Sequence, residues 1–248
     1  MDGRSMKISI LTLFPEMYEG FLNTSIIKKA RLKELVEIEC IDIRSFTTNK
    51  HNRVDDYPFG GGQGLVMAVQ PVLDALNSVK QENSYTLISS PKGTTFNQKK
   101  ARDLSLKDHI IFICGHYEGI DDRILNYVDE EISIGDYILT GGELASMVIS
   151  DAIVRLLDGV IKEASHQDES FEEHRLEYPQ YTRPLIYDGI EVPEVLLSGH
   201  HEEIRKYRLK ESLRQTWHKR PDLFIREPLN EEETKMMIEI LKEEIKKG

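Results

Sequence analysis

The sequence is poor in the features that would assign a protein class directly. It has only two cysteines in 248 residues, Cys40 and Cys114, far apart and without metal-ligand spacing. This excludes a disulfide framework and predicts two buried free thiols in a reducing cytoplasm. No apolar run approaches the roughly 18 residues of a membrane span. Residues 7–13 alternate like a strand and do not form the apolar core of a signal peptide. We therefore expect a cytoplasmic protein that does not enter a membrane.

Several common ligand motifs are also absent. No G-x-G-x-x-G opens the first predicted βα unit, which argues against an ordinary dinucleotide site. Residues 60–64, GGGQG, lack the Lys-Ser/Thr of a P-loop, so we interpret them as a flexible or substrate-shaping hinge. None of the eight histidines lies in an HExxH or Cys/His cluster, so a structural zinc is not expected. His116 is more typical of a loop residue than of a catalyst.

Positive charge is scarce overall but concentrated in one segment. The net charge of -11 argues against indiscriminate nucleic-acid binding. Residues 204–226 nevertheless carry eight Lys/Arg against Glu211 and Asp222, with Tyr207 and Trp217 among them. The segment is either a solvated amphipathic helix or an RNA-binding surface. We favour RNA binding. Its cations are Arg205, Lys206, Arg208, Lys210, Arg214, Lys219, Arg220 and Arg226.

Apolar periodicity predicts an α/β domain followed by helices. Strand patterns alternate with helical ones in the first two thirds of the chain, which favours a mainly parallel sheet. The composition changes after Gly159, where residues 163–177 hold six acids and few large apolar side chains. We predict an α/β domain over 1–160, a flexible linker over 161–177 and a helical domain over 178–248. The predicted strands are 7–14, 36–43, 85–89 and 109–114; the predicted helices are 25–33, 71–80 and 144–157.

Three glycine-containing loops follow or end predicted strands. They are SSPKG at 89–93, CGHYEGIDD at 114–122 and ISIGDYILTGGE at 132–143. Glycine lets backbone approach a ligand where a side chain would block it. Together the loops predict one ligand pocket.

Two further features each allow two interpretations. The acidic stretch SHQDESF at 165–171 is either solvated surface or a mobile loop that carries a general base, Asp168 or Glu169. Arg155, near the end of an apolar helix pattern, is either a structural residue or a stabiliser of developing negative charge. Composition alone does not decide between them.

Motifs along nearly the whole chain resemble those of bacterial tRNA (guanine-N1)-methyltransferases of the SPOUT class. The matching stretches include LFPEM, RVDDYPFGGGQGLVM, SSPKG, CGHYEGID, EISIGDYILTGGE, EYPQYTRP, EVPEVLLSGHHEEI and RLKESLRQTW, in one order. The resemblance implies a trefoil-knotted α/β domain (1–160), a flexible interdomain linker (161–177) and a helical tRNA-binding domain (178–248). It also implies a homodimer whose active sites lie at the subunit interface.

The resemblance further implies methyl transfer from S-adenosylmethionine to N1 of the guanine next to the anticodon of tRNA (position 37). Arg155 matches the family's catalytic arginine and would stabilise O6. The family's basic aspartate lies in a motif similar to DSF; here the motif is ESF, so Glu169 takes that position and Asp168 is the alternative. The family also implies a need for Mg²⁺. The implied cofactor residues are Ser90, Pro91, Gly115, Tyr117, Glu118, Ile134, Gly135, Asp136, Tyr137, Ile138, Leu139, Gly141 and Gly142.

For the tRNA itself we expect contacts from Gly60 and Gly61, in the loop that helps to cradle the target base, and from the basic segment at Arg205, Arg208, Lys210 and Arg214. Two rival functions remain at this point. One is another knotted RNA methyltransferase that acts on a ribose or a different base. The other is an RNA-binding protein that holds the cofactor without chemistry.

Overall fold

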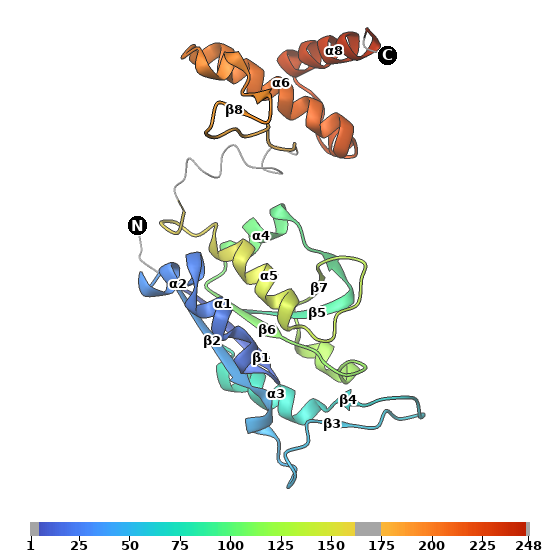
Figure 1. Cartoon of the computed structure of the whole chain (residues 1–248). Coiled ribbons are helices and arrows are strands. Elements are labelled where there is room, and N and C mark those ends of the chain that lie inside the picture. The colour runs from blue at the N-terminus through green and yellow to red at the C-terminus, as the bar shows by residue number, and fades with distance from the viewer. Residues whose placement is uncertain (1–4, 162–174, 247–248) are drawn as a thin grey trace. The chain divides into compact units, whose positions relative to one another are not determined.

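The computed structural model describes residues 5–161 and 175–246 (Figure 1). Its contacts divide the chain into two compact units, Met1–Lys162 and Glu163–Gly248. Asp168 and Glu169 lie outside the described residues, as does most of the predicted linker. Each unit is described separately below.

The first unit is built on a five-stranded sheet in the order β2-β1-β6-β5-β7. All four strand pairings are parallel, which confirms the predicted α/β class with a parallel sheet. A short antiparallel pair, β3 and β4, follows β2. The strands are β1 (Met6–Thr12), β2 (Val36–Asp42), β3 (Asp55–Asp56), β4 (Val66–Met67), β5 (Ser84–Thr95), β6 (His109–Ile113) and β7 (Glu130–Ser133).

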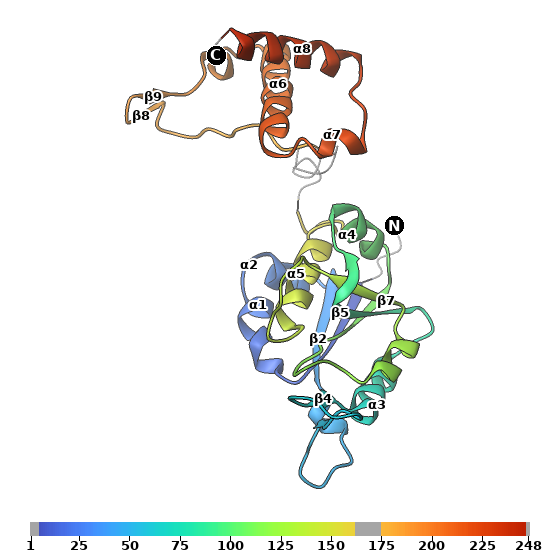
Figure 2. The same cartoon turned by 90° about the vertical axis from the view of Figure 1, so that its right-hand side faces the viewer.

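Helices cover both faces of this sheet. One apolar cluster joins β1 and β6 to α2 and α5, and a second joins the opposite faces of the strands to α3. Figure 2 shows α1, α2 and α5 on one side of the sheet and α3 on the other. Burial on both faces explains why β6 is buried along its whole length and apolar from Ile110 to Ile113. The helical segments are η1 (Pro15–Tyr18), α1 (Glu19–Asn23), α2 (Ser25–Leu32), η2 (Ile43–Phe46), α3 (Val69–Val79), α4 (Gln98–Ser105), η3 (Asp122–Tyr127) and α5 (Glu143–Val154).

Two boundaries differ from the prediction for clear physical reasons. The helix predicted to begin at Pro71 begins at Val69, because proline has no N–H to lose in the first turn of a helix. The strand predicted to end at Ser89 continues to Thr95. Ser89 and Thr94 both pair with Ile132, so the four residues between them bulge out of the ladder. The SSPKG loop is therefore an excursion within β5.

The second unit is helical with one small hairpin. Helices α6 and α8 pack around Leu213, Met237 and Ile240. Asn230 caps α8: its side chain accepts from the Glu233 N–H, and the Glu233 carboxylate accepts from the Asn230 N–H. None of the helices in the described part of the chain combines the length and apolar character of a membrane span. The elements are β8 (Ile186–Tyr187), β9 (Ile190–Glu191), η5 (Glu194–Leu197), α6 (His201–Lys219), α7 (Leu223–Arg226) and α8 (Glu231–Ile245).

Candidate active site

A cavity of about 430 Å³ lies at the carboxyl ends of β5, β6 and β7. These strands are neighbours in the sheet, and in open parallel sheets ligands bind at this edge. The walls come from the three glycine-containing loops that follow or interrupt the strands. The tertiary structure therefore brings together three segments that are separated by up to fifty residues in sequence.

Close backbone packing explains the glycines at the centre of these loops. The Gly142 N–H donates to the Gly115 carbonyl at 2.9 Å. A Cβ on Gly142 would overlap the Ser89 hydroxyl and lie only 2.8 Å from the Cys114 Cα. The three loops meet at this residue, so even a methyl group there would separate them.

The hinge at residues 60–64 is anchored to the wall of this cavity. The Glu118 N–H donates to the Leu65 carbonyl at 3.1 Å, and Met67 pairs with Ile120 in an isolated parallel bridge. Gly64 has a φ of +82°, and a Cβ there would collide with the Glu118 side chain. A positive φ and a close neighbour both favour glycine. Gly60 and Gly61, by contrast, have open space around them.

A network of buried polar side chains lies next to the loops that line the cavity. The Thr12 hydroxyl donates to the Glu143 carboxylate at 2.8 Å, and the Tyr18 hydroxyl lies 2.7 Å from the Ser146 hydroxyl. Burial raises the pKa of the Cys114 thiol to about 12. A thiol with such a pKa stays protonated and is a poor nucleophile at neutral pH. This fits the prediction that Cys114 is a buried free thiol.

His116 lines the cavity in a way that the sequence did not reveal. Its ring centroid lies 5.0 Å from that of Phe14 and 5.2 Å from that of Tyr117. Its Nδ1 is buried and has no hydrogen-bond partner in the described part of the structure. An unpaired polar atom is costly unless something else satisfies it.

All the predicted cofactor residues except Asp136 line this cavity. The structure adds polar wall residues that sequence reasoning had not selected. Their place in or beside the three glycine-containing loops was the only signal in the sequence, because their spacing did not distinguish them from surface residues. They are Lys92, His116, Asp122, Glu131 and Thr140.

Comparison with known proteins assigns the family. Residues 6–226 match the family model described as tRNA (Guanine-1)-methyltransferase TrmD. The chain belongs to this family. Its relatives include a "tRNA (guanine-N(1)-)-methyltransferase" of Clostridium botulinum (strain Kyoto / Type A2), 56% identical over 94% of this chain and 97% of the relative. Proteins with the same description from Carboxydothermus hydrogenoformans and Alkaliphilus metalliredigens are 56% and 54% identical, covering 92% and 96% of this chain and 91% and 99% of theirs.

The structure does not bring Arg155 to the cavity. Arg155 caps the carboxyl end of α5, whereas the α5 residue that lines the cavity is Ala145, near the other end. At a rise of about 1.5 Å per residue, the two are about 15 Å apart along the helix axis. That is farther than an arginine side chain reaches. Within one chain, the predicted catalytic arginine therefore lies away from the cavity.

The predicted tRNA-binding cations of α6 are mostly neutralised by acids. Arg205 bonds to Glu202 and Glu232, Lys210 to Glu239 and Glu243, and Arg214 to Glu211 and Glu243. Arg208 differs, because its guanidinium stacks over the Tyr178 ring at 4.8 Å from the centroid. The positive charge that stands out in the sequence is therefore largely balanced by α8 in the fold.

The described residues hold no group of three or more His, Cys, Asp or Glu side chains placed to bind a metal ion. The Mg²⁺ requirement that the resemblance implies therefore has no site assigned among these residues.

Proposed function

We propose that the chain transfers the methyl group of S-adenosylmethionine to N1 of the guanine that follows the anticodon of tRNA. The observation that carries this proposal is the three-loop cavity in a chain whose residues 6–226 match the methyltransferase family. The names of the relatives specify N1 of a guanine in tRNA. The position next to the anticodon comes from the motif resemblance.

The cavity suits an S-adenosyl nucleoside in size and in chemistry. Apolar side chains such as Ile88 and Leu139 can enclose an adenine, and the glycine loops expose backbone N–H and C=O groups beside them. Glu118 adds a carboxylate that can attract a cationic sulfonium. When bound, S-adenosylmethionine supplies an electrophilic methyl group.

The chain's own residues would then handle the proton of guanine. Its N1–H must be removed as the methyl group arrives, because transfer to a protonated nitrogen leaves a positive charge on the base. A carboxylate of the ESF motif, Glu169 or the adjacent Asp168, would take this proton. As N1 loses its proton, negative charge builds on O6, where the Arg155 guanidinium can donate hydrogen bonds. The target base must leave its stack to reach the cavity.

The separation of Arg155 from the cavity supports a shared active site. If two copies assemble as the resemblance implies, the cavity of one copy and Arg155 of the other can serve the same guanine. The trefoil knot of the SPOUT class also forms part of this proposal. So does a linker over 161–177 that carries the base and joins domains 1–160 and 178–248.

The proposal is tested by incubating the protein with methyl-labelled S-adenosylmethionine and unmodified tRNA, followed by digestion to nucleosides. We expect label in N1-methylguanosine, lost when the guanine after the anticodon is replaced by adenine. Label on a ribose would favour a different knotted methyltransferase. Cofactor binding without any labelled RNA would favour an RNA-binding protein without chemistry.

The identity of the base is tested by single-turnover methyl transfer with Glu169→Gln and Asp168→Asn. Each substitution removes one carboxylate and keeps its size. We expect Glu169→Gln to slow transfer at least a hundredfold, as the loss of a general base does, while S-adenosylmethionine binding is retained. Slowing by Asp168→Asn alone would assign the base to Asp168.

A further inference from the structure

The second unit contains its own cavity, of about 540 Å³, which no step of the methyl transfer uses. It lies between the segment before β8, the residue that follows β9, η5 and the first half of α6. Its wall combines two tyrosines and two arginines with aliphatic side chains. The residues that matter here are Tyr178, Tyr181, Arg183, Leu185, Leu197 and Arg208.

The cations of this cavity differ from the other cations of α6. Arg208 stacks on the Tyr178 ring, and no ion pair is found for either Arg208 or Arg183 among residues 175–246. Arg205, one turn earlier on α6, bonds to the carboxylates of Glu202 and Glu232. An ion-paired arginine must give up its carboxylates before it can bind a phosphate. Arg208 can engage an incoming anion or ring without that loss.

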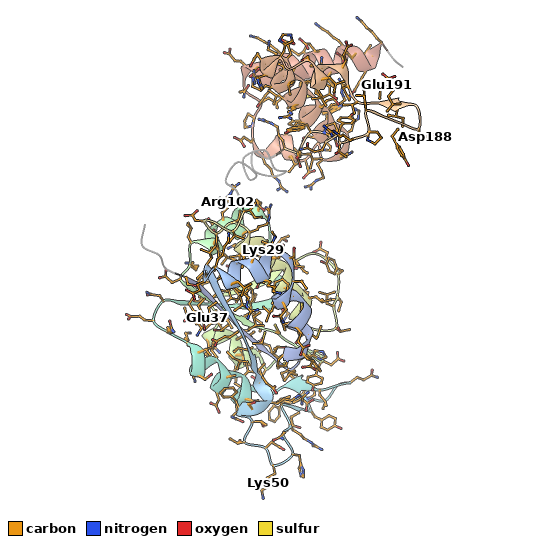
Figure 3. The ribbon with its side chains drawn as sticks, turned by 60° about the vertical axis from the view of Figure 1, so that its left-hand side comes forward. Lys29, Glu37, Lys50, Arg102, Asp188 and Glu191 are labelled. Atoms are coloured by element: carbon orange, nitrogen blue, oxygen red, sulfur yellow. The ribbon has the colours of Figure 1, made fainter. Side chains whose placement is uncertain are left out.

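The aromatic side chains provide flat surfaces at the mouth of the same cavity. The Tyr181 side chain is 45% exposed, and its hydroxyl interacts with that of Tyr207. The aliphatic side chains Leu185 and Leu197 also line the cavity and are themselves about half exposed. Figure 3 labels Asp188 and Glu191 on the β8–β9 hairpin, where Asp188 forms the turn with Gly189. These two acidic residues do not line the cavity.

We propose that this cavity captures one unstacked base of the bound RNA. The base would stack on tyrosine and on the Arg208 guanidinium, and Arg183 would face the adjoining phosphate. Aromatic rings and arginine planes are the groups on which proteins stack single-stranded bases. The inference rests on the proposed function for the identity of the RNA, a tRNA. In this proposal the RNA is bound by a single pocket and not by a contact spread along the basic face of α6.

The proposal is tested by measuring the dissociation constant for unmodified tRNA at fixed salt. Arg208→Ala and Tyr181→Ala should each weaken binding about tenfold, the effect expected for loss of one stacking partner. Arg208→Lys keeps the charge but loses the planar group, so it should also weaken binding. Lys235→Ala is the charge control: it removes one cation from the exposed surface of α8, outside the cavity. It should change the constant less than about twofold.

Two outcomes would overturn the pocket. One is an equal loss of affinity in Arg205→Ala and Arg208→Ala, which would mean that the whole face of α6 binds by charge. The other is unchanged tRNA affinity with an altered oligomeric state in sedimentation, which would mean that another copy of the chain covers the cavity. Circular dichroism of each variant establishes that it is folded. If Arg208→Ala does not fold, Arg208→Lys and Tyr181→Ala still test the pocket.

The pocket and the proposed function can fail separately. S-adenosylmethionine affinity, measured by calorimetry, should be the same in wild type and in all cavity variants, because the two cavities share no residue. If the wild type binds tRNA with the predicted dependence on Arg208 but methylates no guanine, the proposed function fails and the pocket stands. If the wild type methylates guanine while the variants of the second-unit cavity bind tRNA normally, the proposed function stands and the pocket fails.

Discussion

The Thr12 hydroxyl donates a 2.8 Å hydrogen bond to the Glu143 carboxylate, and both side chains are buried. Thr12 ends β1 and Glu143 begins α5, so this bond joins the centre of the sheet to the helix that follows the third glycine loop. A carboxylate in the first turn of a helix also interacts favourably with the helix dipole. The contact fixes the first turn of α5, which carries the cavity-lining Ala145, to the end of β1.

Replacing this hydroxyl should destabilise the first unit. Thr12→Val preserves shape but leaves a buried carboxylate oxygen without this donor and the Phe14 N–H without its acceptor, which costs about 1–3 kcal/mol. Because Trp217, the only tryptophan, lies in the second unit, unfolding of the first unit should be followed by hydrogen exchange of the β1 and β6 amides. Thr95→Val is the control, since Thr95 is exposed at the end of β5; its effect should stay within about 0.5 kcal/mol. Equal effects of the two substitutions would mean that the Thr12–Glu143 hydrogen bond contributes no more to the stability of the first unit than an exposed threonine does.

Gly142→Ala should distort the cavity between the three glycine-containing loops. The new methyl group would displace Ser89 or the backbone at Cys114, and a shift of this kind separates the loops that meet there. We expect S-adenosylmethionine affinity, measured by calorimetry, to fall at least tenfold. Gly20→Ala is the matched control, because Gly20 lies in α1 with no atom within 4 Å of the position of the new Cβ. Unchanged cofactor affinity in Gly142→Ala would contradict a binding site between these loops.

A mixture of two inactive variants should recover activity if the active site is shared. Arg155→Ala retains the cavity, and Gly142→Ala retains Arg155. In a mixed dimer, one site would combine the intact cavity of the first chain with the intact arginine of the second. Random assortment then predicts about a quarter of wild-type methyl transfer after the variants are unfolded and refolded together. No recovery would place the arginine and the cavity of each active site in the same chain.

Acid should weaken the second unit through Glu243. Hydrogen bonds from Lys210 and Arg214 lower the pKa of this carboxyl group from its ordinary 4.5 to about 2. A lowered folded-state pKa contributes stability above about pH 4.5, and this stability is lost as the pH falls toward 2. We expect the midpoint of thermal unfolding, followed by Trp217 fluorescence, to fall over this range. The decrease should be small, because the carboxyl group is 43% exposed and solvent screens the pair.

Glu243→Gln provides the control for this pH dependence. Glutamine keeps the shape but cannot ionise, so the variant should lose less stability than the wild type between pH 4.5 and 2. High salt should have a similar effect on the wild type, because about 1 M salt reduces the Debye length to about 3 Å. Identical pH profiles of wild type and variant would show that the Glu243 ion pairs contribute nothing measurable.

The pattern of residues was sufficient to predict four of the five strands of the main sheet and the helices α2, α3 and α5. Strands β1, β2 and β6 fall where apolar periodicity placed them. The predictions failed at boundaries that depend on partners. The continuation of β5 beyond the SSPKG loop was not predictable, since it requires a second pairing of Thr94 with Ile132 on a strand more than thirty residues away.

The basic segment shows the limit of counting charges along a chain. Its eight cations stand out in the sequence, but Glu232, Glu239 and Glu243 on α8 neutralise three of the four predicted to bind tRNA. The acids that matter are close only after α6 and α8 pack. Arg208 was included with the others, and only its position over Tyr178 distinguishes it.

By itself the sequence determined the α/β class, the helical second part and the family, because periodicity and ordered motifs are properties of the chain alone. It also located the three glycine loops. The packing of the chain was needed to show that these loops meet at Gly142, that His116 lies in their wall and that the cavity lies at the end of α5 opposite Arg155. The physical reason is that cavities, buried polar atoms and ion pairs arise from distances between residues far apart in sequence, which pairing and packing set.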